Sequence, residues 1–143
     1  VCAVAGVEQI AFGSVDFSSE SGIADEHHAL DAVRTQIVLE SVRAGMLPPI
    51  DGVSVNFSDA ALITQDARRS RQLGYGAKLC IHPAQVAPVN AAFAPSAAEI
   101  DWAERVLAAV EASHGAATAV DGKMIDKPLV DKARRIVSAV TAG

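Results

Sequence analysis

Short strand-like runs alternate with longer helix-like stretches in the N-terminal part of the chain, and this order constrains the fold more than any other feature. Residues 9–12, 52–57 and 77–81 are runs that contain β-branched or aromatic side chains. Residues 25–43 and 58–74 lie between them and have apolar side chains at helical spacing, with a glycine at or soon after each C-terminal end. Strand, helix, strand, helix, strand is typical of parallel βα units, so we predict an α/β fold with a parallel sheet.

The chain after Pro83 has a different pattern, in which we predict helices and no further strand. Residues 84–93 form the first helical piece. Ser96 and Glu99 have the spacing of a capping box, in which two side chains satisfy backbone N–H groups at the start of a helix. The last helix begins near 126–128 and carries one apolar face.

The two long helices of this C-terminal part need a surface to lie on. Three strands and their own helices leave little surface free, so we expect the rest of a barrel or a neighbouring subunit to cover them. We therefore divide the chain into residues 1–93, which carry the strands, and residues 94–143, a helical segment that packs on a neighbouring subunit.

Composition and charge exclude several classes of protein. Half of the 143 residues are apolar and 20% are charged, which is typical of a globular chain and not of a disordered one. The formal net charge of −5 argues against a nucleic-acid partner, and the cluster of Arg68, Arg69 and Arg71 fits a solvated helix face. No apolar run approaches the roughly 20 residues that span a bilayer, so we expect no membrane partner.

The two cysteines, Cys2 and Cys80, lie in apolar strand-like runs, so we expect buried, inert thiols in a reducing, cytoplasmic setting. Their spacing does not suggest a zinc site. The chain starts at Val1 with no charged leader and no methionine, and we interpret it as the interior of a longer protein.

Asp16 is the first candidate site residue, because it follows the first strand-like run and Gly13. In parallel α/β folds the carboxyl ends of the strands face the ligand. A carboxylate at that position can bind Mg²⁺ through one oxygen. A turn or N-cap aspartate explains the same position without a ligand. A magnesium site would normally need a second carboxylate, which the neighbouring strand ends do not supply.

Asp126 is the second candidate, and it precedes a helix that has Pro128 in its first turn. An N-cap aspartate, worth about 1 kcal/mol, explains this position. Met124 and Ile125 could instead bury part of the carboxyl group and fit it for proton transfer.

His82 and Pro83 end the third strand-like run and form the candidate substrate-binding pair. A histidine at a strand end can donate a hydrogen bond to a substrate, or it can hydrogen-bond the turn that follows. The other histidines have simpler explanations: we expect His27 and His28 to be solvated at a helix start, and His114 to make a favourable contact with a helix end.

Four segments, taken in order, resemble a known family. They are residues 11–17 (AFGSVDF), 49–53 (PIDGV), 73–83 (LGYGAKLCIHP) and 122–126 (GKMID). Together they resemble the citrate lyase beta subunit-like (HpcH/HpaI aldolase) family over essentially the whole chain. The third and fourth segments are rather specific in combination, and each is weak alone.

The resemblance implies a (β/α)8 TIM barrel of which this chain holds the last three βα units, within residues 1–93, and a C-terminal tail. It implies Mg²⁺ as cofactor, and acyl-coenzyme A substrates in the lyase branch of the family. Asp16 matches the family's metal aspartate, whereas the second metal carboxylate and a substrate-binding arginine would lie before Val1. Asp126 matches an aspartate that reaches a neighbouring subunit's active site, which implies a homo-oligomer, with a trimer as the expected form.

The chemistry implied is the reversible cleavage of a β-hydroxyacyl-CoA such as citryl-, malyl- or citramalyl-CoA. The metal would polarise the oxygen of the keto product, and Asp126 would protonate the thioester enolate carbon. Two departures from the family pattern, Ser18–Ser21 and Ala77, leave the substrate open. The alternatives are a pyruvate-type class II aldolase without coenzyme A, against which the Met-Ile-Asp segment counts, and a non-catalytic scaffold chain, which the start without methionine favours.

Overall fold

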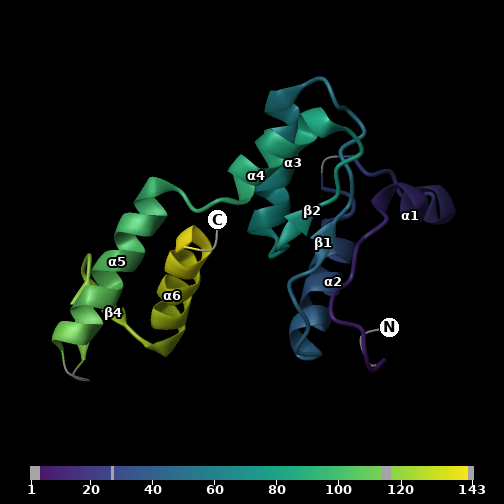
Figure 1. Cartoon of the computed structure of the whole chain (residues 1–143). Coiled ribbons are helices and arrows are strands. Elements are labelled where there is room, and N and C mark those ends of the chain that lie inside the picture. The colour runs from purple at the N-terminus through teal and green to yellow at the C-terminus, as the bar shows by residue number, and fades with distance from the viewer. Residues whose placement is uncertain (1–3, 27, 114–116, 142–143) are drawn as a thin grey trace. The chain divides into compact units, whose positions relative to one another are not determined.

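The computed structural model describes residues 4–26, 28–113 and 117–141. The chain divides into two compact units, Val1–Phe93 and Ala94–Gly143 (Figure 1). Each unit has its own clusters of buried apolar residues.

Three parallel strand segments form the centre of the first unit. Strand β1 (Ile50–Asp51) lies in the middle and pairs with β2 (Ala77–Lys78), with Ile50 opposite Ala77. On the other side of β1, Ala11 forms a parallel bridge with Ile50, and the Phe12 N–H donates to the Ile50 carbonyl at 2.9 Å. The predicted order of parallel segments in an α/β fold is therefore confirmed, while closure into a barrel stays a prediction.

Four α-helices accompany these segments in the described part of the first unit. They are α1 (Ser14–Ser21), α2 (Asp31–Arg43), α3 (Ala60–Gln72) and α4 (Val86–Phe93), the last preceded by a 3-10 turn, Pro83–Gln85. Helix α3 begins where expected because the Asp59 carboxylate accepts hydrogen bonds from the Ala61 and Leu62 N–H groups. It ends just before Gly74, whose φ of +99° only glycine adopts readily.

Two sequence predictions for this unit are wrong in detail. The helix expected from residue 25 begins at Asp31, because Asp25 lies in a loop and is paired with Arg34. The strand expected at 52–57 is instead β1, two residues earlier. The Asn56 side chain explains this shift, since its oxygen accepts from the Ser58 N–H at 2.9 Å and so folds the segment into a turn.

Two apolar clusters hold the first unit together. One lies between α3 and α4 and consists of Ile63, Ala67, Val89 and Ala92. The other joins the first strand segment to α2 and contains Phe12, Leu30 and Tyr75, with Phe17 of α1 packed against it. The Phe12 and Phe17 rings lie 5.7 Å apart, so α1 is attached to the end of its strand by an aromatic contact.

The second unit consists of two helices and a hairpin. Helix α5 (Ala97–Ala112) starts with the predicted capping box, in which the Ser96 and Glu99 side chains each bond a backbone N–H of the other residue. Strands β3 (Thr118–Val120) and β4 (Lys123–Ile125) pair antiparallel, and helix α6 (Lys127–Thr141) follows.

The hairpin corrects the expectation of no strand after Pro83. Its two turn residues, Asp121 and Gly122, both have positive φ, 52° and 73°. Asp-Gly is the residue pair that favours such a two-residue hairpin turn. The signal was therefore present in the sequence, but the flanking strands are only three residues long.

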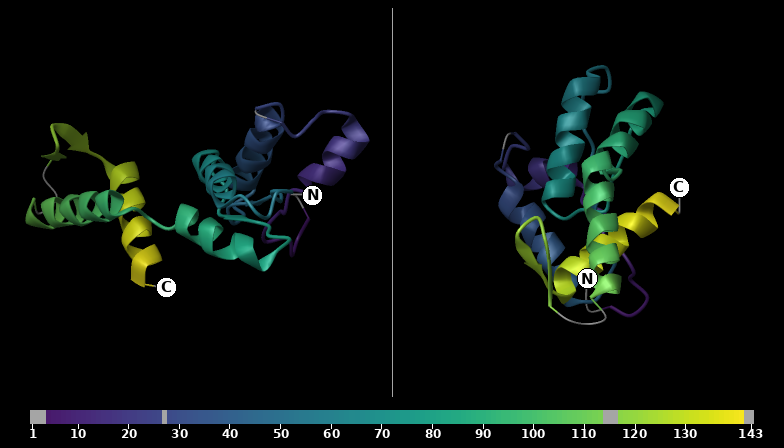
Figure 2. Two further views of the ribbon diagram at one scale, coloured as in Figure 1. Left: turned by 90° about the horizontal axis from the view of Figure 1, so that it is seen from above. Right: turned by 90° about the vertical axis from the view of Figure 1, so that its left-hand side faces the viewer.

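Helices α5 and α6 bury their apolar faces against each other, and the left view of Figure 2 shows α6, in yellow, crossing α5, in green. The buried residues are Ala103 and Val106 of α5 and Ala133 and Ile136 of α6. We expected these helices to find no surface within this chain on which to pack. That expectation is wrong in part, because α5 and α6 each provide a packing surface for the other. In the described residues, no helix is both long and apolar enough to cross a membrane.

Candidate functional site

The carboxyl ends of the three parallel segments come together at one edge of the first unit, and Asp16 lies there. Helix α1 starts directly after the first segment, with Asp16 in its first turn and Gly13 as its N-cap. The Asp16 carboxylate folds back over that cap, since its Oδ2 would be 3.3 Å from a Cβ placed at Gly13. The first turn of a helix is favourable for a carboxylate, which explains the conformation without a ligand.

The Asp16 carboxylate is exposed and makes no ion pair with any other residue that the structure describes. Its oxygens are therefore free to bind a hard cation, which matches the donor type that Mg²⁺ requires. Mg²⁺ is commonly bound through one or two carboxylates together with substrate and water, so Asp16 fits one ligand position. Across residues 4–26, 28–113 and 117–141, no group of three or more His, Cys, Asp or Glu side chains could hold a metal.

His82 lies at the same edge, after β2, and is exposed. Its Nδ1 accepts a hydrogen bond from the Ala84 N–H at 3.1 Å, and its ring stacks on Phe57 with the centroids 4.9 Å apart. The turn interaction considered for this histidine is therefore present. Because Nδ1 is an acceptor in this arrangement, Nε2 is the nitrogen that could donate to a substrate. Pro83 follows in the first position of the 3-10 turn and is also exposed.

Gln85, which the sequence analysis did not single out, organises the loops of this edge. It is 1% exposed, and its Nε2 donates to the Ser54 carbonyl at 2.7 Å and to the Asn56 carbonyl at 3.1 Å. Its Oε1 accepts from the Ile81 N–H at 2.8 Å. One buried amide therefore fixes the loop after β1 to the loop after β2.

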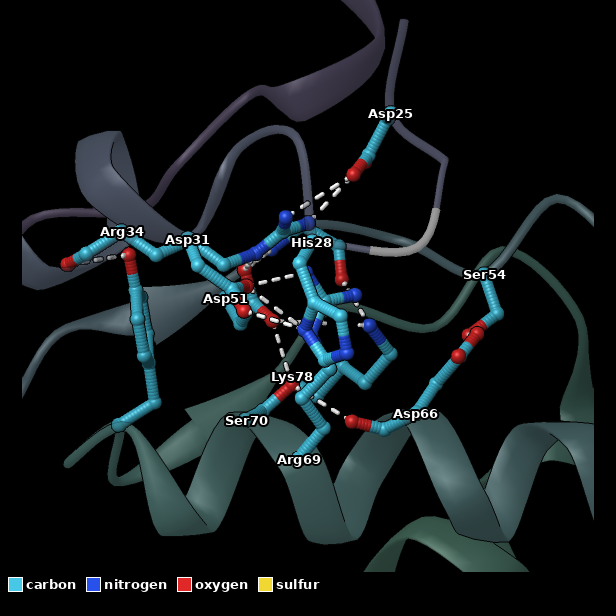
Figure 3. Close-up of polar contacts among 12 residues, drawn as sticks. Asp25, His28, Asp31, Arg34, Asp51, Ser54, Asp66, Arg69, Ser70 and Lys78 are labelled. Atoms are coloured by element: carbon cyan, nitrogen blue, oxygen red, sulfur yellow. Dashed lines mark hydrogen bonds and ion pairs between the residues drawn. The ribbon is translucent and has the colours of Figure 1, made fainter.

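A network of buried charges lies between the strands and helices α2 and α3, just behind this edge (Figure 3). Arg34 of α2 is at its centre. Its Nε donates to Asp51 Oδ1 at 2.9 Å, and its two terminal nitrogens donate to the two carboxylate oxygens of Asp25 at 2.9 and 3.0 Å. Burial by itself would lower the pKa of Arg34, but the two carboxylates outweigh it and raise that pKa.

Asp51 of β1 is satisfied on both oxygens. Besides Arg34, its Oδ1 accepts from the Gly52 N–H at 2.8 Å, and its Oδ2 accepts from the Ser70 hydroxyl of α3. Lys78 of β2 places its Nζ 3.8 Å from Asp51 Oδ2 and donates to the Gly52 carbonyl at 2.7 Å. Burial lowers the pKa of Lys78, although the charges of Asp51 and Asp66 oppose this shift.

This network borders a small cavity of about 140 Å³ whose lining includes Asp25, Arg34, Asp51, Asp66 and Lys78. Burial tends to raise the pKa of Asp25, but the hydrogen bonds and charge of Arg34 outweigh burial and lower that pKa. The Asp25 carboxylate is therefore kept ionised as a partner of the buried Arg34. Sequence reasoning missed this network because its members are far apart in the chain.

Asp126 lies in the second unit, where it caps α6: its Oδ1 accepts from the Leu129 N–H at 3.2 Å. The capping explanation is therefore present. Asp126 is exposed and Met124 is 74% exposed, so the flanking apolar pair does not bury the carboxylate within this unit. The structure thus brings Asp16, His82 and Pro83 to one edge of the first unit and places Asp126 in the other unit.

Cys80 is a free and exposed thiol, so the expectation that it is buried is wrong, because the strand expected over residues 77–81 ends at Lys78, before Cys80. His28 is exposed as expected, and its Nδ1 lies 2.6 Å from Asp31 Oδ2. Cys2, His27 and His114 lie outside the described residues.

Comparison with curated proteins places this arrangement in a family. The chain is 34% identical over 142 residues to the human protein "Citramalyl-CoA lyase, mitochondrial", and 35% identical over 133 residues to a "Citrate lyase subunit beta-like protein" of Deinococcus radiodurans. These alignments cover 95% and 89% of this chain. The chain belongs to the citrate lyase subunit beta-like proteins. No model of a protein family matches it.

The chain spans less than half the length of these citrate lyase beta-like relatives, 41% of the human protein and 46% of the Deinococcus protein. A "(3S)-malyl-CoA thioesterase" of Cereibacter sphaeroides is also similar, with 37% identity over 109 residues, 74% of this chain and 38% of that protein.

Among solved structures, the protein CitE from Mycobacterium tuberculosis, in complex with magnesium, acetoacetate and coenzyme A, is similar with a TM-score of 0.83 and 27% identity. The match covers 98% of this chain and 54% of CitE. A citrate lyase from Burkholderia xenovorans matches with a TM-score of 0.81 and 27% identity, over 99% of this chain and 47% of that protein.

Proposed function

We propose that this chain carries part of the active site of a magnesium-dependent carbon–carbon lyase that cleaves or forms a β-hydroxyacyl-CoA such as citryl-, malyl- or citramalyl-CoA. The observation that carries the proposal is the exposed, unpaired Asp16 carboxylate at the carboxyl ends of the parallel strands, in a chain related to citrate lyase beta-like proteins. The ligands named for CitE, magnesium and coenzyme A, support the proposed cofactor and substrate class.

In this proposal Asp16 supplies one oxygen ligand to Mg²⁺. The metal, when bound, supplies Lewis-acid polarisation of a substrate oxygen. His82 offers its Nε2–H to the keto or carboxylate group of the substrate beside Pro83, while its Nδ1 remains bonded to the turn. Stacking on Phe57 holds the imidazole ring in the orientation that this role requires.

Asp126 is the proposed proton carrier. When the carbon–carbon bond breaks, the β-hydroxyl group gives its proton to solvent water and becomes the keto group. The bonding electron pair stays on the thioester fragment, and the carboxylic acid of Asp126 delivers its proton to that carbon. In the direction of bond formation, the Asp126 carboxylate removes the same proton. Since Asp126 lies in the second unit, we propose that it serves the active site of a neighbouring copy in a homotrimer, with residues 94–143 packed on that copy.

The architecture and setting belong to the same proposal. The three parallel segments of residues 1–93 would be part of a (β/α)8 TIM barrel, whose active sites lie at the carboxyl ends of the strands. The compartment also stays a prediction: a reducing, cytoplasmic setting was expected from the cysteines, whereas the human relative is named as mitochondrial.

The test compares Asp16→Asn and Asp126→Asn with matched surface variants on the same helices, Glu20→Gln on α1 and Asp131→Asn on α6. Mn²⁺ binding is followed by electron paramagnetic resonance, since manganese accepts the same oxygen ligands as magnesium. Citramalyl-CoA and malyl-CoA are the substrates, and keto acid and free thiol are assayed separately. We expect Asp16→Asn to lose Mn²⁺ binding, and Asp126→Asn to keep it but lose about 10²–10⁴-fold in turnover.

Other outcomes point elsewhere. Unchanged Mn²⁺ binding and turnover in Asp16→Asn would remove the proposal. Free thiol released without keto acid would indicate thioester hydrolysis, the activity in the name of the Cereibacter relative. Turnover of pyruvate and aldehydes without coenzyme A would indicate an aldolase, and absence of both Mn²⁺ binding and turnover in the parent would favour a scaffold chain.

A further inference from the structure

Helix α1, which carries Asp16, is only eight residues long and is fixed at its start by close packing. Ser14, its first residue, is 1% exposed and lies directly against Gly52. A Cβ at position 52 would come within 2.8 Å of the Ser14 Cβ and 3.0 Å of the Phe12 carbonyl oxygen, closer than side chains normally approach. Only glycine at position 52 therefore lets the start of α1 lie on the tip of β1.

The loop that follows α1 is fixed by a salt bridge. The helix ends at Gly22, which is in the left-handed conformation with φ +73°. Three residues later, Asp25 receives both terminal nitrogens of Arg34 in a two-fold contact. Such a fork fixes both the position and the orientation of a carboxylate, so the chain that leaves α1 is tied to α2.

Arg34 is itself held by β1, on whose tip the start of α1 lies. Its Nε bonds to Asp51, and the same Asp51 oxygen accepts the Gly52 N–H at 2.8 Å. The guanidinium also lies over the Phe12 ring, 5.5 Å from the centroid. One side chain therefore connects the strand tip under the start of α1 with the loop after its end.

We infer that Arg34 is a positioning residue, which acts through Asp25 to hold α1, and with it Asp16, at the carboxyl ends of the strands. The consequence for the metal rests on the proposed function of Asp16. The alternative is that Arg34 only stabilises the fold, like any buried arginine. The two differ at Asp25, because removing its carboxylate leaves the buried Arg34–Asp51 pair intact and releases the loop after α1.

The chain offers a matched control for Asp25. The side chains of Asp25 and Asp31 have similar exposures, 24% and 27%, and each pairs with an arginine: Asp25 with Arg34, and Asp31 with Arg69. Asp31, however, is the first residue of α2 and ties that helix to α3, not to α1. Asp25→Asn and Asp31→Asn thus each remove one negative charge, and only Asp25→Asn removes the contact with Arg34 that holds the loop after α1.

The experiment measures amide hydrogen exchange of residues 14–21, the Mn²⁺ dissociation constant and the urea midpoint in parent, Asp25→Asn, Asp31→Asn and Arg34→Lys. We expect Asp25→Asn to speed exchange in α1 about tenfold and to weaken Mn²⁺ binding about three- to tenfold, with a nearly unchanged urea midpoint. Arg34→Lys keeps the charge but loses both the fork to Asp25 and the Nε bond to Asp51, so it should change exchange and Mn²⁺ affinity in the same way and also lower the urea midpoint. Asp31→Asn should leave exchange in α1 and Mn²⁺ affinity unchanged.

Two results would overturn the inference. One is parent-like exchange of α1 in Asp25→Asn. The other is parent-like Mn²⁺ affinity in Asp25→Asn when Asp16→Asn has lost binding. If Asp16→Asn binds Mn²⁺ as the parent does, the proposed metal role of Asp16 fails instead. The amide exchange of residues 14–21 then decides by itself whether the contact between Arg34 and Asp25 holds α1.

Discussion

The two units of this chain differ in where their charged side chains lie. In the first unit, Arg34, Asp51 and Lys78 are almost fully buried between strands and helices, with side chains 3–4% exposed. In the second unit, the described ion pairs lie on the surface, where Arg105 and Asp121 are about half exposed. The interior between α5 and α6 is instead formed by small and branched apolar side chains.

The difference matches what each unit is proposed to do. An apolar helix pair gains stability from burial and tolerates small shifts. A buried charge network gains less, because desolvation offsets much of the attraction, but each of its hydrogen bonds requires a defined geometry. The network therefore lies where position matters, directly behind the strand ends that carry Asp16 and His82.

The largest effect is expected from breaking the network at its centre. Asp51→Ala leaves the Arg34 Nε without an acceptor in a buried site and removes the counter-charge of Lys78. We expect it to lower the free energy of unfolding of the first unit by about 3–5 kcal/mol. Urea unfolding followed by amide exchange in residues 28–93 measures this loss. The single tryptophan, Trp102, packs in the second unit, and its fluorescence should keep the parental midpoint.

The matched control removes a charge from the other unit. Asp121→Asn breaks the exposed ion pair with Arg105, in which Arg105 Nη1 lies 2.6 Å from Asp121 Oδ1. Exposed pairs contribute little, so neither unit should change measurably. A first unit that stays as stable in Asp51→Ala as in Asp121→Asn would show that the buried network contributes no stability, and the contrast between the units would fail.

A smaller loss is expected from opening a cavity in the second unit. Ile136 of α6 is 8% exposed and packs against α5. Ile136→Ala should cost about 2–3 kcal/mol through lost burial and the space left behind. The midpoint of Trp102 fluorescence in urea reports it, and amide exchange in the first unit should not change. Val140→Ala is the control on the same helix, because Val140 is 47% exposed and should lose far less.

Local signals in the sequence were sufficient for much of the fold. Asp59 and Ser96 cap helices through bonds to residues at most three positions away, so α3 and α5 start where predicted. The parallel order of segments followed from their alternation with helices. Helix α1 was missed because Gly13 caps it without a side chain and its sequence, SVDFSSES, is rich in serine, which favours turns.

Only those residues of the site that follow directly from the order of strands and helices could be predicted. Asp16 and His82 could be assigned to the ends of strands, and the structure locates both at that edge. Gln85, by contrast, bonds to carbonyls 31 and 29 residues away, and Arg34 reaches Asp51 across 17 residues. Such pairs leave no local pattern, because most polar residues are exposed and the sequence around a buried one does not distinguish it from them.

The smallest effect is expected from acid acting on the first unit. The Arg34 guanidinium keeps the pKa of Asp25 below its ordinary value of 3.8, against the opposing effect of burial. A carboxylate with a lowered pKa in the folded state contributes stability that is fully present well above pH 3.8. That contribution is lost as the pH falls through the folded-state pKa. The urea midpoint of the first unit should therefore fall as the pH is lowered through 3.8 and below, and less so in Asp25→Asn, which has no proton to take up at that position. An equal fall in both proteins would mean that the bond between Arg34 and Asp25 does not stabilise the folded state, and that the loop after α1 is held by packing instead.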